Sequence, residues 1–61
     1  MNLEISHAIL RTEHMEAGFR LLEDEHFLYL YDREGTRRCI FSADGATATS
    51  VQNEVDTMMR N

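Results

Sequence analysis

The chain has 61 residues, a formal net charge of −5 and a single cysteine. This length predicts one small domain over residues 1–61, which buries only about 60% of the surface that its unfolded chain exposes and therefore has a small stability margin. One cysteine excludes an intrachain disulfide and is typical of a reducing compartment, and the acidic excess argues against direct binding to nucleic acid. The sequence has no basic leader followed by an apolar run and no apolar stretch of about 20 residues, which predicts a cytoplasmic protein without a membrane segment.

The N-terminal part of the chain contains one clear helical pattern. Residues 2–5 alternate polar and apolar side chains, which favours a strand, but four residues are too few to decide. Ser6 suits a helix N-cap, and small or apolar side chains then recur at helical spacing, namely Ala8, Ile9, Thr12, Met15 and Phe19. We therefore expect a helix over about 7–17 that ends at Gly18, because glycine accepts the left-handed conformation that closes helices. The alternative continues the helix through Gly18 to about Glu23.

Three strands are expected in the middle of the chain, near residues 19–23, 26–32 and 36–42. The second of them, HFLYLYD, is rich in aromatic residues and is the strongest strand pattern of the chain. The segment Asp32-Arg33-Glu34-Gly35 then has Asp at the first position of a type I turn and Gly where a left-handed residue follows. This pattern predicts a hairpin with a three-residue loop and a glycine bulge.

The hairpin loop determines which residues of the second and third strands face each other. With Asp32 opposite Thr36, the expected pairs are Tyr31 with Arg37, Leu30 with Arg38, Tyr29 with Cys39, Leu28 with Ile40, and Phe27 with Phe41. One face of the hairpin then carries Leu28, Leu30, Ile40 and the stem of Arg38. The other face, which we call the aromatic face, carries Phe27, Tyr29, Tyr31, Arg37, Cys39 and Phe41.

A second helix is expected over about 48–60. Thr47 can cap it, with Ala46 and Val51 in contact across the cap, or Thr49 can cap it with Gln52 three residues later. One side of this helix carries Val51, Val55, Met58 and Met59, and the other carries polar side chains that we expect in solvent, namely Asn53, Glu54, Asp56 and Arg60. The chain is thus predicted to be an α+β domain, with a helix on either side of a small antiparallel sheet of two or three strands.

Apolar side chains on both faces of the hairpin leave two arrangements open. Both helices can pack on one face, so that the aromatic face needs a partner, or each helix can cover one face in a closed three-layer domain. Tyrosine suits the first arrangement, because its ring is apolar and its hydroxyl stays satisfied at a wet rim. The candidate interaction face is therefore formed by Phe27, Tyr29, Tyr31, Arg37 and Phe41.

The histidines and the cysteine do not form a pattern that is typical of a metal or catalytic site. His7 and His14 are two helical turns apart, whereas two ligands on one helix need a spacing of three or four residues, and the cation Arg11 lies between them. Cys39 and His26 are expected about 10 Å apart along the strands, too far for a nucleophile and its base. We expect the histidines at the surface, no metal, no cofactor and no catalytic residues.

These observations predict a non-enzymatic protein–protein interaction or regulatory module that self-associates as a homodimer through its aromatic face. The alternative is an acidic inhibitor, or nucleic-acid mimic, that binds a basic partner protein. That alternative requires the carboxylates of the two turns to form a stripe along the central strand; they are Glu23, Asp24, Glu25, Asp32 and Glu34.

Overall fold

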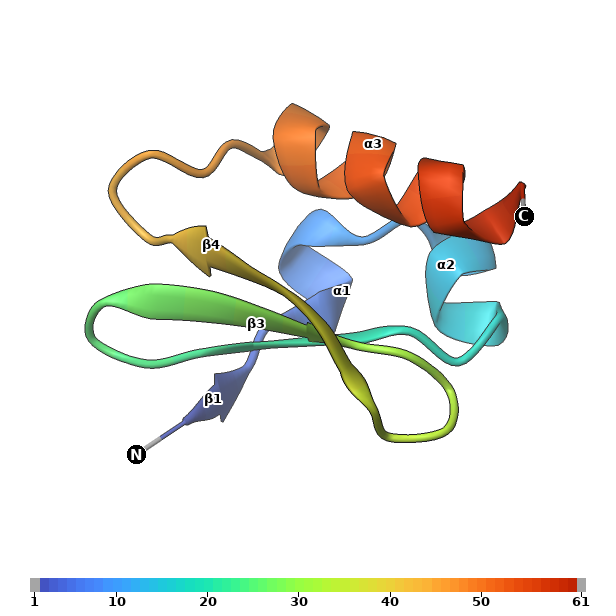
Figure 1. Cartoon of the computed structure of the whole chain (residues 1–61), viewed down its shortest axis with the longest axis horizontal. Helices are drawn as coiled ribbons and strands as arrows, with labels where there is room; N and C mark the ends of the chain where they lie inside the picture. Colours follow the sequence, from blue (N-terminus) through green and yellow to red (C-terminus); the bar gives the residue numbers. More distant parts are fainter. Residues whose placement is uncertain (1, 61) are drawn as a thin grey trace.

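The computed structural model describes residues 2–60, and Figure 1 shows them as an α+β domain. The elements in chain order are β1 (Leu3–Glu4), α1 (Ser6–Ile9), α2 (Thr12–Glu16), β2 (Arg20–Glu23), β3 (Phe27–Tyr31), β4 (Arg37–Ser42) and α3 (Ala48–Met59). The strands form one antiparallel sheet in the order β1-β2-β3-β4. The predicted α+β class is confirmed, with one strand more than expected, because residues 3 and 4 pair with Glu23 and Leu22.

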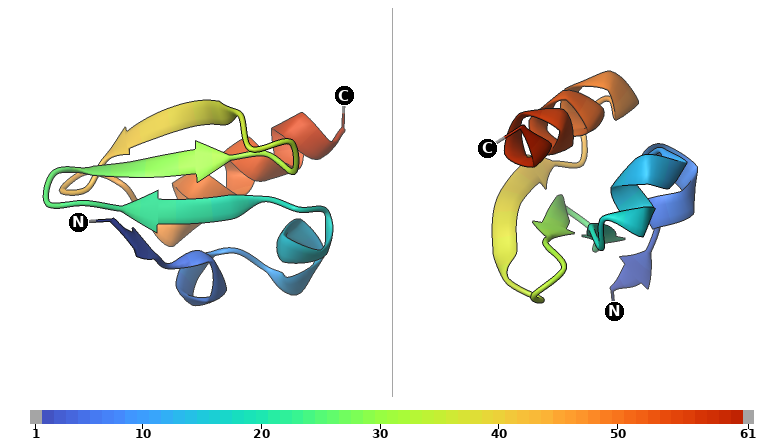
Figure 2. Two further views of the ribbon diagram at one scale, coloured as in Figure 1. Left: turned by 90° about the horizontal axis from the view of Figure 1, so that it is seen from below. Right: turned by 90° about the vertical axis from the view of Figure 1, so that its right-hand side faces the viewer.

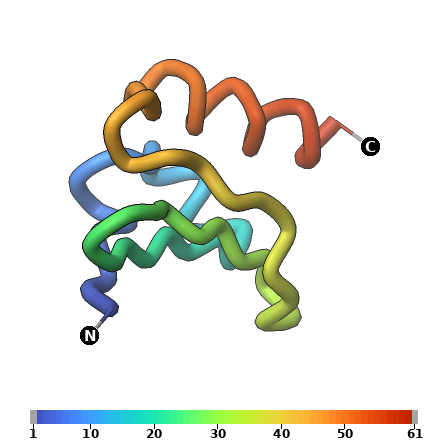
Figure 3. Tube along the Cα trace, turned by 60° about the vertical axis from the view of Figure 1, so that its left-hand side comes forward, coloured from blue at the N-terminus to red at the C-terminus, as the bar shows by residue number. Residues whose placement is uncertain are grey.

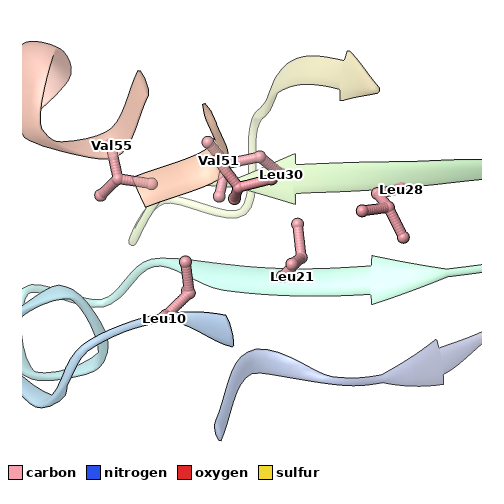
Figure 4. Close-up of a cluster of buried hydrophobic side chains, with 6 residues drawn as sticks. All are labelled: Leu10, Leu21, Leu28, Leu30, Val51 and Val55. Atoms are coloured by element: carbon pink, nitrogen blue, oxygen red, sulfur yellow. The ribbon is translucent and has the colours of Figure 1, made fainter. Parts of the chain in front are cut away.

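All helices lie on the same side of the curved sheet, as the right-hand view of Figure 2 shows. We call the side of the sheet toward the helices the inner face and the opposite side the outer face. Figure 3 shows α3 as a separate layer above the strands. The buried apolar core between helices and sheet is drawn in Figure 4 and consists of Leu10, Leu21, Leu28, Leu30, Val51 and Val55. The molecule therefore has two layers, and no helix of residues 2–60 covers the outer face.

The predicted N-terminal helix is interrupted. It consists of α1 and α2, which are separated at Leu10 and Arg11, and Ser6 is not its N-cap. The Ser6 hydroxyl instead accepts a hydrogen bond from the Leu21 N–H (2.8 Å) and donates one to Glu4 (3.0 Å). Ser6 is buried and continues the pairing of β1 with β2 beyond the end of β1, which turns the first helical turn toward the sheet.

The helical segment ends at Gly18, as predicted, and the alternative that it continues to Glu23 is wrong. Gly18 has a φ of +98°, its N–H donates to the Met15 carbonyl (2.9 Å), and the Phe19 N–H donates to the His14 carbonyl (3.1 Å). These two bonds satisfy the last carbonyls of α2 in the pattern of a Schellman cap. The chain is then free to enter β2.

The predicted hairpin loop between β3 and β4 is confirmed. The Gly35 N–H donates to the Asp32 carbonyl and the Asp32 N–H to the Thr36 carbonyl, both at 3.0 Å, and Gly35 has a φ of +82°. The Asp32 carboxylate accepts the N–H groups of Glu34 (2.9 Å) and Thr36 (3.0 Å). The turn therefore has the conformation that its Asp and Gly residues favour.

The predicted strand register is wrong beyond the first pair. Tyr31 pairs with Arg37 as expected, but Leu30 pairs with Cys39, so that Arg38 is an extra residue in β4, a β-bulge. The remaining pairs are Tyr29 with Ile40, Leu28 with Phe41, and Phe27 with Ser42. Because side chains alternate between the faces of a strand, the bulge moves Cys39 and Phe41 to the inner face and Ile40 to the outer face.

The C-terminal helix α3 agrees with the prediction. Thr47 is its N-cap: the Thr47 hydroxyl accepts the Ser50 N–H (3.0 Å), and the Ser50 hydroxyl accepts the Thr47 N–H (3.1 Å). Val51 and Val55 are completely buried against the sheet. Within residues 2–60, neither α3 nor any other helix is long and apolar enough to cross a membrane.

Candidate functional site

Three rows of side chains cross the outer face of the sheet, because paired residues on antiparallel strands point to the same face. The basic row contains Arg20, Tyr31 and Arg37. The central row contains Glu4, Leu22, Tyr29 and Ile40. The acidic row contains Asp24, Phe27 and Ser42; Asp24 belongs to it because its N–H donates to the Phe27 carbonyl and its carboxylate contacts Tyr29. The outer face thus has a middle that is apolar except for Glu4 at its β1 edge, and this middle lies between a basic and an acidic end.

Four of the five residues predicted for the interaction face lie together on the outer face, namely Phe27, Tyr29, Tyr31 and Arg37. The placement of Phe41 is wrong, since the bulge at Arg38 turns it to the inner face, where it packs against the core. Ile40 lies on the outer face in the place that was expected for Phe41. Sequence reasoning also missed Leu22 on β2, because the turn between the short strands β2 and β3 does not by itself specify how their residues pair.

Tyr29 lies at the centre of the outer face, where three neighbouring side chains contact it. Its hydroxyl donates a 2.6 Å hydrogen bond to Asp24. The Arg37 guanidinium carbon lies 5.8 Å from the centre of the Tyr29 ring, and the Phe27 ring lies 6.3 Å away at a tilt of 55°. Contacts on both sides and at the hydroxyl orient the ring, so that little side-chain entropy remains to be lost when a partner binds.

The Asp24 carboxylate is a fixed negative charge at neutral pH. The hydrogen bond from Tyr29 lowers the pKa of Asp24 to about 2, assisted by the backbone N–H groups of His26 and Phe27. The same bond raises the pKa of Tyr29. At the opposite end, the Arg20 side chain is 67% exposed and lies 3.3 Å from Glu4. The outer face therefore has permanent charges of opposite sign at its two ends.

The apolar part of the outer face is incompletely covered by the chain itself. Ile40 is 51% exposed and Phe27 is 44% exposed, while Leu22, Tyr29 and Tyr31 are half-buried among their neighbours. Side chains from three adjacent strands form this patch. A contiguous apolar patch of this kind on a small domain is typical of a contact surface.

A second polar cluster joins α2 to α3, and sequence reasoning missed it. His14 is completely buried, contrary to the prediction of surface histidines, although His7 and His26 are exposed. Its Nε2 lies 2.8 Å from an Asp56 carboxylate oxygen, and Arg11 donates to both Asp56 oxygens at 2.5 and 2.6 Å. Asp56 therefore bonds the N-terminal segment, and the prediction that it lies in solvent is wrong.

The geometry of this cluster identifies it as a structural link. The Arg11 backbone N–H donates to His14 Nδ1 (3.3 Å), so His14 carries its proton on Nε2 and donates it to Asp56. Gln52 on α3 accepts from the Arg11 guanidinium (3.3 Å) and donates to the Ile9 carbonyl (2.7 Å). Both ring nitrogens of His14 are occupied and the ring is buried, so that no substrate can reach it.

Cys39 lies on the inner face beside α3. Its Sγ is 3.9 Å from a Glu54 carboxylate oxygen, and burial, followed by the Glu54 charge, raises the pKa of the Cys39 thiol. A raised pKa disfavours the thiolate, which is the nucleophilic form. Within residues 2–60, no group of three or more His, Cys, Asp or Glu side chains has the arrangement needed to hold a metal ion.

A shallow hollow of about 370 Å³ lies between the end of α3 and the β3–β4 loop. Phe19, Met58 and Met59 form its apolar wall, and its polar wall contains two carboxylates and two guanidinium groups, from Asp32, Arg33, Glu34 and Arg38. Arg38 and Asp32 are paired at 3.3 Å. The charges of this wall balance, so the hollow has no preference for an anionic or a cationic ligand.

Comparison with known proteins adds no family to this description. No protein-family model matches the chain, and no match was found among curated proteins or solved structures. The class that the fold and the site define is therefore that of a small two-layer α+β domain with an uncovered, partly apolar sheet face.

Proposed function

We propose that the protein is a non-enzymatic protein-interaction module that self-associates through its outer sheet face. One observation carries the proposal: Leu22, Phe27, Tyr29 and Ile40 form an apolar patch on the face of the sheet that lies opposite all the helices. Aromatic residues and arginine are enriched in protein interfaces. The patch combines these residue types, with Arg20 and Arg37 at its rim.

A second copy of the chain suits this face. Among residues 2–60 the core has only six buried apolar side chains, so covering the outer face would add substantially to the buried apolar area. Association also stabilises a marginal fold by mass action. The two ends of the face carry opposite charges, so the face of one copy is complementary to the same face of a second copy. A partner of another kind is not required.

The non-enzymatic part of the proposal is supported by the two groups that resemble catalytic ones. His14 is buried with both nitrogens occupied, and the pKa of the Cys39 thiol is raised. A single cysteine in a small domain is typical of a reducing compartment, and we propose a cytoplasmic location on that ground.

The acidic inhibitor or nucleic-acid mimic takes second place. Asp24 and Asp32 each use one carboxylate oxygen to accept hydrogen bonds from backbone N–H groups of their own turns, so this oxygen is already bonded within the chain. Arg20 and Arg37 lie between these two turns on the outer face. A basic row interrupts the stripe of carboxylates that such a mimic requires, so that no structural observation favours it over self-association.

Sedimentation equilibrium of the purified chain at micromolar concentration tests the proposal. The expected mass is twice the 7.1 kDa of one chain. Ile40→Asp should produce a monomer that remains folded by circular dichroism, because Ile40 is exposed and its replacement by a charge opposes association more than folding. Asn53→Asp adds the same charge on the exposed side of α3 and should leave the mass unchanged. A wild-type chain that sediments as a monomer at micromolar concentration would overturn the proposal. Equal sedimented masses for Ile40→Asp and Asn53→Asp would overturn it too.

A further inference from the structure

We infer that two copies stack outer face to outer face with their two-fold axis perpendicular to the strands, which places Arg20 of each copy against Asp24 of the partner copy. This inference rests on the proposed self-association and specifies its geometry. It follows from the order of the three rows on the outer face and from the charges in them.

The symmetry of a face-to-face pair allows two simple arrangements. The two-fold axis lies in the plane between the sheets, because each face must be turned toward the other. If the axis runs along the strands, each row faces the same row of the partner copy and β2 lies over β4. If the axis runs across the strands, the basic row faces the acidic row of the partner copy and each strand lies over itself, in the opposite direction.

The charges distinguish the two arrangements. An axis along the strands brings Arg20 over Arg37 of the partner copy, so that four guanidinium groups meet at one end of the interface. Juxtaposed like charges that lose solvent strongly oppose association. An axis across the strands instead brings Arg20 over Asp24 of the partner copy twice, once at each end. It also brings Glu4 over Glu4 of the partner copy, but Arg20 of the same chain lies 3.3 Å from each of these carboxylates and compensates their charge. The second arrangement is therefore favoured.

The other residues of the rows are also compatible with an axis across the strands. Tyr31 then lies over Phe27 of the partner copy, which pairs two aromatic rings, and Arg37 lies over the uncharged Ser42 of the partner copy. The central row meets itself, and its apolar residues are Leu22, Tyr29 and Ile40. The strand directions of two stacked sheets differ by about 30° because each sheet is twisted. This rotation shifts residues at the edges of the face relative to the partner copy more than residues at its centre. Contacts of the central row therefore give the clearest test.

Cross-linking of single cysteines provides that test. The experiment uses the full chain with Cys39→Ala, so that no native thiol remains, and a short bis-maleimide as the reagent. Ile40→Cys in this background should give a covalent dimer, because each Ile40 lies over the same residue of the partner copy. Arg37→Cys should not cross-link to itself and should cross-link to Ser42→Cys when the two variants are mixed.

An axis along the strands gives the opposite pattern. Arg37→Cys would then cross-link to Arg20→Cys and not to Ser42→Cys, and Ile40→Cys would not cross-link to itself. This pattern, in a chain that sediments as a dimer, would overturn the inference and leave the proposed function intact. Failure of every pair to cross-link, in a chain that sediments as a monomer, would overturn both. Circular dichroism and sedimentation of the Cys39→Ala chain confirm beforehand that the background remains folded and associated.

Discussion

Gly18 and Arg33 are in direct contact, although one ends α2 and the other lies in the loop between β3 and β4. A Cβ atom on Gly18 would lie 3.0 Å from the Arg33 Cα and closer still to the Arg33 Cβ. Gly18 also has a positive φ. The contact joins the end of the N-terminal helical segment to the hairpin that presents the outer face.

Gly18→Ala should therefore be strongly destabilising. The left-handed backbone disfavours a Cβ by about 1 kcal/mol or more, and overlap with the Cβ and Cα of Arg33 adds about 1–3 kcal/mol. Gly45→Ala is the matched control, because no atom lies within 4 Å of the place that its Cβ would occupy. Urea unfolding of both variants measures the difference. Equal stability of the two alanine variants would contradict the observed contact.

Gly35 tests the backbone effect without a steric one. It has a φ of +82° and no atom within 4 Å of the place that a Cβ would occupy, so the cost of a substitution comes from the backbone alone. Gly35→Val should destabilise by about 1 kcal/mol or more and lower the melting midpoint by roughly 4–8 °C, whereas Gly35→Asn should have a smaller effect because Asn tolerates this conformation. Association should weaken in the same order. Valine and asparagine variants that melt at the same temperature would show that the loop does not require a left-handed residue.

Because Asp56 links α2 to α3, we expect it to contribute more to the stability of the fold than other partly exposed side chains do. In Asp56→Ala the buried His14 Nε2–H loses its acceptor, and we expect a fall in melting midpoint of roughly 4–8 °C. Asn53→Ala removes a polar side chain from the exposed side of the same helix and should change the midpoint little. Thermal unfolding by circular dichroism makes the comparison. If both variants lose the same stability, the cluster contributes nothing specific.

The hydrogen bond between Tyr29 and Asp24 predicts a pH dependence. The ordinary pKa of an Asp carboxyl is about 3.9, whereas that of Asp24 is lowered to about 2. A lowered pKa stabilises the fold above the ordinary value, and this contribution disappears as the pH falls from about 4 to about 2. Tyr29→Phe removes the largest cause of the lowered pKa, so the difference in melting midpoint between the wild type and this variant should shrink over that interval.

Tyr31→Phe is the control for this pH dependence, since it makes the same chemical change two residues along β3. Its difference from the wild type should be constant from about pH 2 to about pH 6. A difference between the wild type and Tyr29→Phe that stays constant over the same interval would show that Tyr29 does not lower the pKa of Asp24.

Features that depend on a few neighbouring residues were predictable from the sequence. Gly18 ends the helical segment and Asp32 with Gly35 forms the hairpin loop, as expected, and Thr47 is the one of the two expected caps, Thr47 and Thr49, that begins α3. Each of these elements satisfies its backbone groups within a short stretch of chain, so its conformation is specified locally. The α+β class follows from these elements and from the apolar patterns between them.

Features that depend on distant partners were decided by the tertiary structure. The Ser6 hydroxyl does not cap the helix and instead accepts a hydrogen bond from the Leu21 N–H, 15 residues away. His14 can be buried because Asp56, 42 residues away, accepts a hydrogen bond from its ring. Neither sequence segment carries information about the other, so local patterns predicted a continuous helix with surface histidines. The backbone is extended at Leu10 and Arg11, between α1 and α2, where Leu10 enters the core and Arg11 bonds Asp56.

The outer face combines both kinds of information. Its aromatic residues on β3 were predictable, because alternation along one strand needs no partner. The bulge at Arg38 was not, although this single extra residue exchanged Phe41 for Ile40 on the outer face. A strand has a period of two, so one inserted residue reverses every side chain after it, and packing of Cys39 and Phe41 against the core favours that register. The sequence by itself therefore determined that an aromatic strand face exists, and only the tertiary structure decided which neighbours complete it and that the helices leave it uncovered.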